Sequence, residues 1–201
     1  MSAPNHDDSS AACVQSGDRA AFDLIARQYQ TILLRFVRCN FPNIPDAEDI
    51  VQESLLKAFE NIGKYQASRP LKSWLLTITY RMAINHIRHR NTHTRLIAGL
   101  RNHTGLNSPT PSDATAIRDE SQNLWNVAAK LLTPTQLHAV WLLYAEDMNR
   151  KDIAQILGKS RPTTKLILYR ATRTLRAYFV KPSTTPNRLA EDSRIAPGVL
   201  L

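Results

Sequence analysis

Apolar residues recur at intervals of three and four along most of this 201-residue chain, and no segment alternates apolar with polar residues. The first such stripe includes Phe22, Ile25, Tyr29 and Phe36. This spacing places apolar side chains on one face of an α-helix, whereas a half-buried strand requires alternation. The sequence therefore predicts an all-α protein.

Capping and helix-ending residues divide the chain into separate helices. Pro42 and Pro45 end the first helix, because proline has no N–H to donate. Asp46 with Asp49 predicts a capping box at the start of the second helix, and Gly158 predicts a left-handed helix end. The expected helices cover residues 18–40, 46–62, 70–90, 115–131, a segment starting at 133, 150–157 and 161–179.

The helices fall into two groups, so we expect two small helical domains joined by a flexible linker. The short polar residues of 1–17 predict a disordered arm. Asn, Thr, Ser, Pro and Gly dominate 93–114, which predicts the linker, and 182–201 is expected to be a flexible tail. The domains would then span 18–92 and 115–181.

Positive charge is concentrated in two stretches of the chain. The net charge is +9, and residues 61–112 hold 8 Lys/Arg while 161–181 hold 6, with no Asp or Glu in either stretch. Two acid-free basic stretches are typical of surfaces that contact a polyanion, although a charge run can also be only a solvated face. A membrane surface is disfavoured, because no terminal basic amphipathic helix is present.

Several function classes find no support in the sequence. The two cysteines, Cys13 and Cys39, are too far apart for a CxxC motif, which fits a reducing cytoplasm. The longest apolar run, 139–145, is too short to span a membrane, and the N-terminus does not resemble a secretory signal. Because there is no P-loop, nucleophile elbow or metal-ligand spacing, we expect neither an enzyme nor a bound cofactor or metal.

Three histidines, His86, His89 and His93, share one face of the third predicted helix. Such a face could hold a metal, but no carboxylate lies nearby to orient the ligands. We therefore interpret the histidines as part of a basic helix end.

The last two predicted helices have the proportions of a helix-turn-helix motif. A short helix, 150–157, is followed by a tight turn and a longer basic helix, 161–179. In that motif the start of the second helix contacts base edges in the major groove. An ordinary helical hairpin is the alternative interpretation.

Two sets of motifs together resemble a known family. The first set is Asp46-Ala47-Glu48-Asp49 with Gln52-Glu53, followed by Trp74-Leu75 in a helix that ends rich in Arg; the second is Leu132-Thr133-Pro134 with Gln136, then 152–158, Thr163 with Lys165, and 169–171. Together they resemble the extracytoplasmic-function (ECF) sigma factors of RNA polymerase. The resemblance covers about 18–90 and 122–180, in the order that the family shows.

The resemblance implies roles for three groups of residues. It implies that the acidic second helix binds core RNA polymerase through Asp46, Glu48, Asp49, Gln52 and Glu53. It implies that a loop and the third helix hold the single strand of the promoter's minus-ten element through Lys64, Tyr65, Gln66, Ser68, Arg69, Arg81, Asn85, Arg88 and Arg90. It implies that the helix-turn-helix recognises the minus-thirty-five element through Ser160, Arg161, Thr163, Lys165 and Arg170.

Some positions depart from the family pattern. Arg81 and Asn85 stand where the family commonly has Asn and Asp, and Leu166 and Ile167 stand where it often has Ser and Arg. We expect Leu166 and Ile167 to lie on the outer face of the last helix, either against thymine methyl groups or under a protein cover. Trp74 belongs to an apolar stripe, so we expect it in the core rather than as a stacking platform.

The resemblance implies a cytoplasmic sigma factor that brings core RNA polymerase to promoter DNA in response to a stress or another signal. An anti-sigma factor is a further partner that it allows, and membrane insertion is not expected. The alternative is a free-standing helix-turn-helix regulator that binds duplex DNA without polymerase. The acidic helix and the basic loop of the N-terminal half distinguish the two, because such a regulator needs neither.

Overall fold

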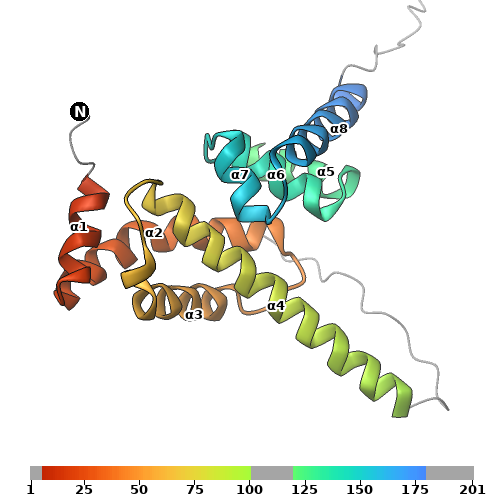
Figure 1. The fold of residues 1–201 in the computed structure, drawn as a ribbon. Coiled ribbons are helices and arrows are strands. Elements are labelled where there is room, and N and C mark those ends of the chain that lie inside the picture. The colour runs from red at the N-terminus through yellow and green to blue at the C-terminus, as the bar shows by residue number, and fades with distance from the viewer. Residues whose placement is uncertain (1–5, 101–119, 180–201) are drawn as a thin grey trace, which may run out of the picture.

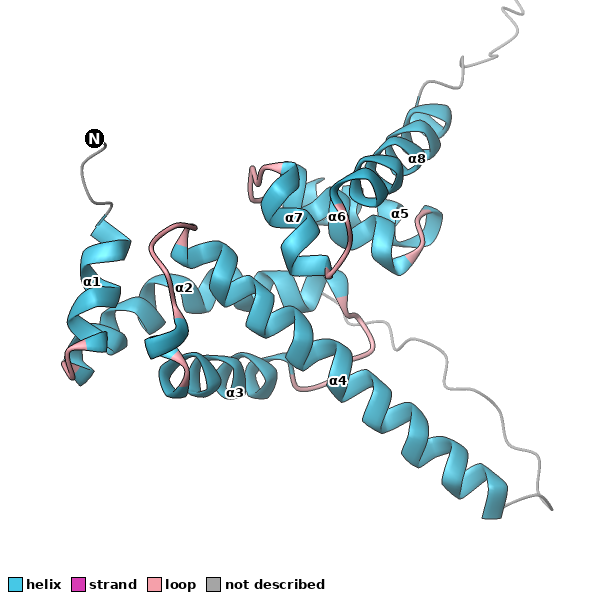
Figure 2. Ribbon diagram, in the orientation of Figure 1, coloured by secondary structure: helices cyan, strands magenta, loops and turns pink. Residues whose placement is uncertain are grey.

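The computed structural model describes residues 6–100 and 120–179, and all of their regular elements are helices, as the sequence predicts (Figures 1 and 2). The first group consists of α1 (His6–Gln15), α2 (Arg19–Asn40), α3 (Ala47–Glu60), the short 3-10 helix η1 (Ile62–Lys64) and α4 (Leu71–Leu100). The second group consists of α5 (Glu120–Leu131), α6 (Pro134–Tyr144), α7 (Arg150–Leu157) and α8 (Arg161–Phe179).

In the first group α2, α3 and α4 pack against one another, and α1 covers one end of α2. The apolar stripe predicted for α2 is its buried face, which includes Phe22, Ile25 and Phe36. Asp18 caps α2 by accepting hydrogen bonds from the backbone N–H groups of Ala20 and Ala21. These local signals fix where the first long helix begins and which face it buries.

The second group follows its capping residues closely. Thr133 and Gln136 form a capping box at the start of α6, and Asn149 caps α7. Gly158 ends α7 with φ +62°, a left-handed conformation that favours glycine. The short α7, this turn and the longer α8 therefore form a helix-turn-helix arrangement (Figure 1).

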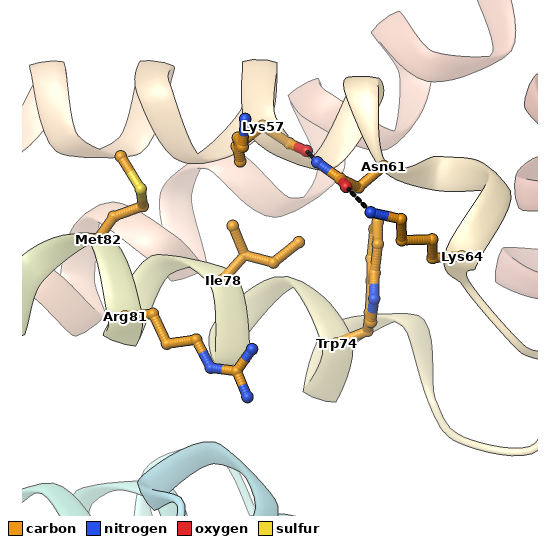
Figure 3. Close-up of a pocket in the computed structure, with 7 residues that line it drawn as sticks. All are labelled: Lys57, Asn61, Lys64, Trp74, Ile78, Arg81 and Met82. Carbon is orange, nitrogen blue, oxygen red and sulfur yellow. Dashed lines mark hydrogen bonds between the residues drawn. The ribbon is translucent and has the colours of Figure 1, made fainter.

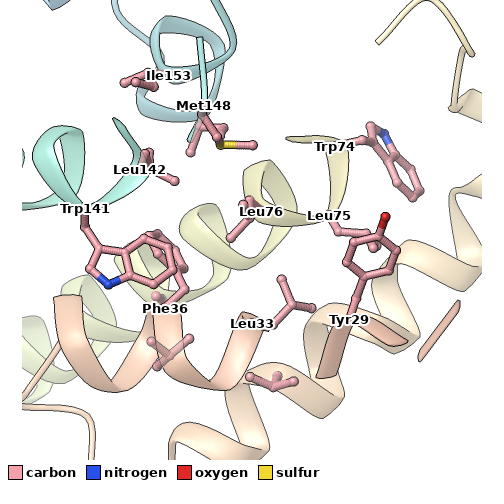
Figure 4. Close-up of a cluster of buried hydrophobic side chains, with 14 of the residues drawn as sticks. Tyr29, Leu33, Phe36, Trp74, Leu75, Leu76, Trp141, Leu142, Met148 and Ile153 are labelled. Carbon is pink, nitrogen blue, oxygen red and sulfur yellow. The ribbon is translucent and has the colours of Figure 1, made fainter. Parts of the chain in front are cut away.

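The two groups share one hydrophobic core. Trp141 of α6 packs on Phe36 of α2 with ring centroids 5.1 Å apart, and α7 lies against α4. Figure 4 shows Leu76 of α4 facing Leu142 and Met148 of the second group. The helix-turn-helix half is thus packed directly on the N-terminal half.

Two boundaries differ from the sequence predictions. Residues 6–15 form α1 instead of part of a disordered arm, because Ala11 and Val14 are buried in the shared core. The helix α4 continues to Leu100, ten residues beyond its predicted end at Arg90 and into the predicted linker. The rest of the predicted linker and the predicted tail, 182–201, lie outside the described residues.

One predicted cap is also absent. Asp46 occupies the N-cap position of α3, but its side chain makes no capping hydrogen bond there. No helix in the described part of the chain is long and apolar enough to cross a membrane.

Candidate nucleic-acid interface

An acidic face runs along α3. Glu48, Asp49, Gln52 and Glu53 are exposed on it, and the exposed Asp46 immediately precedes the helix. The opposite face, with Ile50, Val51, Ser54 and Ala58, is buried against α2 and α4. Glu48 is paired with Arg38 of α2, whereas Asp49 and Glu53 have no ion pair among the described residues. The free carboxylates therefore present negative charge to solvent.

A groove of 370 Å³ lies between the end of α3 and the first turns of α4 (Figure 3). Three cations, two aliphatic side chains, an indole and an amide line it: Lys57, Lys64, Arg81, Ile78, Met82, Trp74 and Asn61. Its lining contains no carboxylate. Aromatic and aliphatic walls beside cations suit a nucleobase and its phosphate.

The amide of Asn61 fixes one edge of this groove. Its Nδ2 donates to the backbone oxygen of Lys57 at 2.9 Å, and its Oδ1 accepts from Lys64 Nζ at 2.9 Å (Figure 3). Trp74 is only 5% exposed, in agreement with the prediction that it belongs to the core, yet part of its ring forms a wall of the groove. Lys57 and Asn61 could not be recognised as site residues from the sequence, because neither belongs to a recognisable motif.

The loop from η1 to α4 is held from inside. Tyr65 is 6% exposed, with its ring centroid 5.5 Å from that of Trp74 and its hydroxyl donating to the backbone oxygen of Arg69 at 3.0 Å. Tyr65 therefore shapes the loop and does not present an exposed stacking ring, unlike the expectation for a residue that contacts a flipped base. Gln66 and Ser68 are exposed.

Gln15, at the end of α1, fastens the same loop. Its Nε2 donates to the backbone oxygens of Ile62 at 2.8 Å and Tyr65 at 3.0 Å. These contacts join residues about fifty positions apart in the chain, so no local signal in the sequence could have revealed them. The predicted arm is thus part of the support of the loop.

Cations continue from the loop along α4. Arg81, Asn85, Arg88 and Arg90 are exposed, and Arg90 donates to the backbone oxygen of Asn43. Arg69 is half-buried; burial and the nearby charge of Arg81 lower the pKa of its guanidinium. Like charges that are held close together favour the approach of an anion.

Two of the three histidines on α4, His86 and His89, are exposed, and the side chain of His93 lies outside the description. No three His, Cys, Asp or Glu side chains gather as a metal site among those described.

The outer face of α8 carries the predicted recognition residues. All five residues selected from the sequence are exposed: Ser160, Arg161, Thr163, Lys165 and Arg170. Ser160 Oγ caps the helix by accepting from the backbone N–H of Thr163 at 3.3 Å. Thr164, Leu168 and Ala171 face inward, as their spacing of four and three residues along a helix requires.

The two aliphatic residues of α8 behave differently from each other. Leu166 is 46% exposed, as expected, whereas Ile167 is half-buried and packs against the core. Of these two residues, Leu166 alone therefore presents its side chain on the face that carries Thr163 and Arg170.

Comparisons with known proteins agree with this arrangement. Residues 25–93, which span most of α2, all of α3 and most of α4, match the family model described as Sigma-70 region 2. The chain is 25% identical over 162 residues to the ECF RNA polymerase sigma factor BldN of Streptomyces coelicolor, covering 80% of this chain and 61% of that protein. It is 27% identical over 172 residues to the ECF RNA polymerase sigma factor SigW of Bacillus subtilis, covering 81% of this chain and 91% of that protein.

The fold is also similar to that of a solved sigma factor. The structure of the sigma factor RpoE in complex with the anti-sigma factor NepR, from Bartonella quintana, superposes with a TM-score of 0.62 at 23% identity and covers 79% of this chain and 96% of that one. Residues 25–93 therefore belong to the Sigma-70 region 2 family, and the chain is similar to ECF RNA polymerase sigma factors across both helical groups.

Proposed function

We propose that this chain is a dissociable subunit that binds core RNA polymerase in the cytoplasm and directs it to promoters, where it helps to open the DNA. The observation that carries the proposal is the match to Sigma-70 region 2, because it covers the acidic helix, the groove and the basic helix in one block. A free-standing helix-turn-helix regulator would have no use for that block. The chain acts as an initiation factor, not as an enzyme.

The acidic face of α3 is the proposed polymerase contact. Asp49 and Glu53 are exposed and free of ion pairs among the described residues, so binding a basic partner surface breaks no existing pair. Glu48 would first have to exchange Arg38 for the partner. Charge complementarity of this kind sets the rate and the specificity of association.

The groove and the loop above α4 are the proposed minus-ten site. A flipped base would lie against Trp74, and Lys64 and Arg81 would neutralise the phosphates beside it. Arg69, Gln66, Ser68 and the exposed residues of α4 would follow the single strand. Tyr65 takes part only by holding the backbone of Arg69.

The exposed start of α8 is the proposed minus-thirty-five reader. Arg161 and Lys165 are placed for base edges or phosphates, and Arg170 follows five residues after Lys165. RpoE of Bartonella quintana is held by an anti-sigma factor, and we propose a protein inhibitor that responds to a stress or another signal for this chain also.

Transcription in vitro with added core polymerase, followed by mapping of the start sites, tests the proposal. The chain should confer initiation at defined sites that core enzyme alone does not use. Asp49→Lys and Glu53→Lys should each weaken co-elution with core enzyme, and the double variant should abolish it while helicity is retained. Asp23→Lys, at an exposed position of α2, changes the charge as much as each single variant does and is the matched control for them. Unchanged co-elution of the double variant would refute the proposed contact.

A further inference from the structure

A buried carboxylate links the two halves of the molecule. Glu146, in the loop between α6 and α7, has a side chain only 2% exposed. Its Oε1 is paired with Arg35 of α2 and its Oε2 with Lys72 at the start of α4. Lys72 Nζ also donates to the backbone oxygen of Glu146 at 3.2 Å. Two cations of one half thus converge on one oxyanion of the other.

This pairing depends on the contact between the halves. Burying a carboxylate is costly unless it is paired, and both partners of Glu146 come from the N-terminal group. Arg35 also lies over the ring of Trp141, 5.7 Å from its centroid. The side chain of Arg35 is already 54% exposed and that of Lys72 is 28% exposed. If the halves separated, both cations would lose the same partner, Glu146.

One of the two cations, Lys72, adjoins the loop proposed to hold the promoter strand. Lys72 follows Arg69 by three residues, and Arg69 is close enough to Asp152 of α7 for that charge to act on its pKa. The helix-turn-helix half therefore pairs Glu146 with Lys72 and brings the charge of Asp152 near Arg69. An acid in such a position occupies the place that a phosphate would take.

The contact between the halves leaves several polar groups unsatisfied. Within the described residues, the buried side-chain atoms that lack a hydrogen-bond partner are Asn40 Oδ1, Ser73 Oγ and His138 Nδ1. Asn40 and His138 are joined across the contact by a hydrogen bond from His138 to the backbone oxygen of Asn40. Ser73 lies on the same face of α4 as Tyr80, and the ring of Tyr80 packs on His138. Unpaired buried groups weaken a contact, and they would regain water if it opened.

We propose that Arg35 and Lys72 form a phosphate-binding pair for the promoter strand, and that Glu146 occupies this pair in the free chain as an intramolecular substitute for the phosphate. The closed form is then a resting form, and separation of the halves exposes the site next to Arg69. The inference rests on the proposed function, because it assumes that single-stranded promoter DNA is bound by the N-terminal half. It adds two residues that the sequence analysis did not select.

Binding of a fluorescein-labelled single-stranded DNA of mixed sequence to the full chain tests the pair. Glu146→Gln keeps the shape of the side chain and removes its charge, so affinity should rise about tenfold, as expected for one released charge-assisted contact. The dependence on salt should steepen by about 0.7 in logarithmic slope per added phosphate contact. The same sequence with uncharged methylphosphonate linkages should show no gain.

Asp147→Asn is the matched control. It makes the same charge change one residue away, at an exposed position whose φ of +51° asparagine tolerates. It should leave strand binding unchanged, and adding Arg35→Gln and Lys72→Gln to Glu146→Gln should remove the gain. Three results would overturn the proposal. They are a gain in affinity for the strand that is no larger for Glu146→Gln than for Asp147→Asn, a gain that survives the loss of Arg35 and Lys72, and a gain that extends to the methylphosphonate strand.

A second measurement does not depend on the stability of the Glu146 variant. Holoenzyme assembled with Arg35→Gln/Lys72→Gln should bind promoter DNA more weakly than wild-type holoenzyme and with a shallower salt slope. Equal affinity and slope would overturn the phosphate-binding role. Initiation by the wild-type chain with core polymerase is measured in parallel, so that failure of the sigma factor function itself is recognised separately.

Discussion

The contact between the two halves should weaken in mild acid, because it buries a neutral histidine. His138 is 2% exposed, and its Nε2 donates to the backbone oxygen of Asn40 at 3.1 Å. Its Nδ1 has no partner among the described residues, and the rings of Phe41 and Tyr80 lie 4.6 and 5.5 Å away. Burial lowers the pKa of His138 from 6.5 to about 4, since a second proton would find no acceptor there.

The sign and size of the effect follow from this shift. Because the pKa is lower in the packed form, the stabilisation is complete above 6.5 and is lost as the pH falls from 6.5 towards about 4. Between about pH 8 and about pH 5 the free energy of unfolding should fall by about 2 kcal/mol from His138 alone.

Urea unfolding across this pH range measures the loss. Carboxylates titrate in the same range, so the informative quantity is the difference between the wild type and His138→Gln, whose amide can still donate to Asn40 but does not titrate. The wild type should lose about 2 kcal/mol more than the variant on going to about pH 5. Parallel pH profiles for the two proteins would refute the argument.

Three further predictions concern separate parts of the molecule. Arg161→Ala and Lys165→Ala should each weaken duplex binding by the full chain by about 1–3 kcal/mol if they read bases; titrations at several salt concentrations should show a shallower slope if they instead contact phosphate. Gln15→Met should free the loop at η1 and speed amide hydrogen exchange at 62–66, whereas Gln15→Lys, which keeps a donor, should largely restore protection. Gly158→Ala should lower the free energy of unfolding by about 1 kcal/mol in urea titrations, since its φ of +62° disfavours a side chain.

Features encoded within a few residues could be predicted from the sequence. The capping box at Thr133 and Gln136, the cap at Asn149 and the left-handed Gly158 are all present where their local signals place them. The inward face of α8 follows from helical spacing in the same way. Each of these depends only on neighbouring residues and is largely independent of the rest of the fold.

Features that depend on distant contacts could not be predicted. The segment that forms α1 is polar at its start. It is helical because it packs on α2 and because Gln15 donates a hydrogen bond to the loop. From the sequence alone, the ring of Tyr65 could equally have faced solvent. In the structure it packs beside the ring of Trp74. Glu146 and Asp147 are adjacent acids in one loop, yet the first is buried between two cations and the second is exposed.

The end of α2 depends on both a local sequence signal and a distant contact. Pro42 and Pro45 stop the helix, as the sequence predicts, and stopping a helix leaves its last carbonyl groups without partners inside the helix. One of these carbonyls belongs to Asn40, and it accepts its hydrogen bond from His138 of the other half. The docking point therefore exists because the helix ends there, although only the fold reveals which residue fills it. Because that donor is a histidine whose other nitrogen is unpaired, the same helix end makes the contact between the halves sensitive to protons.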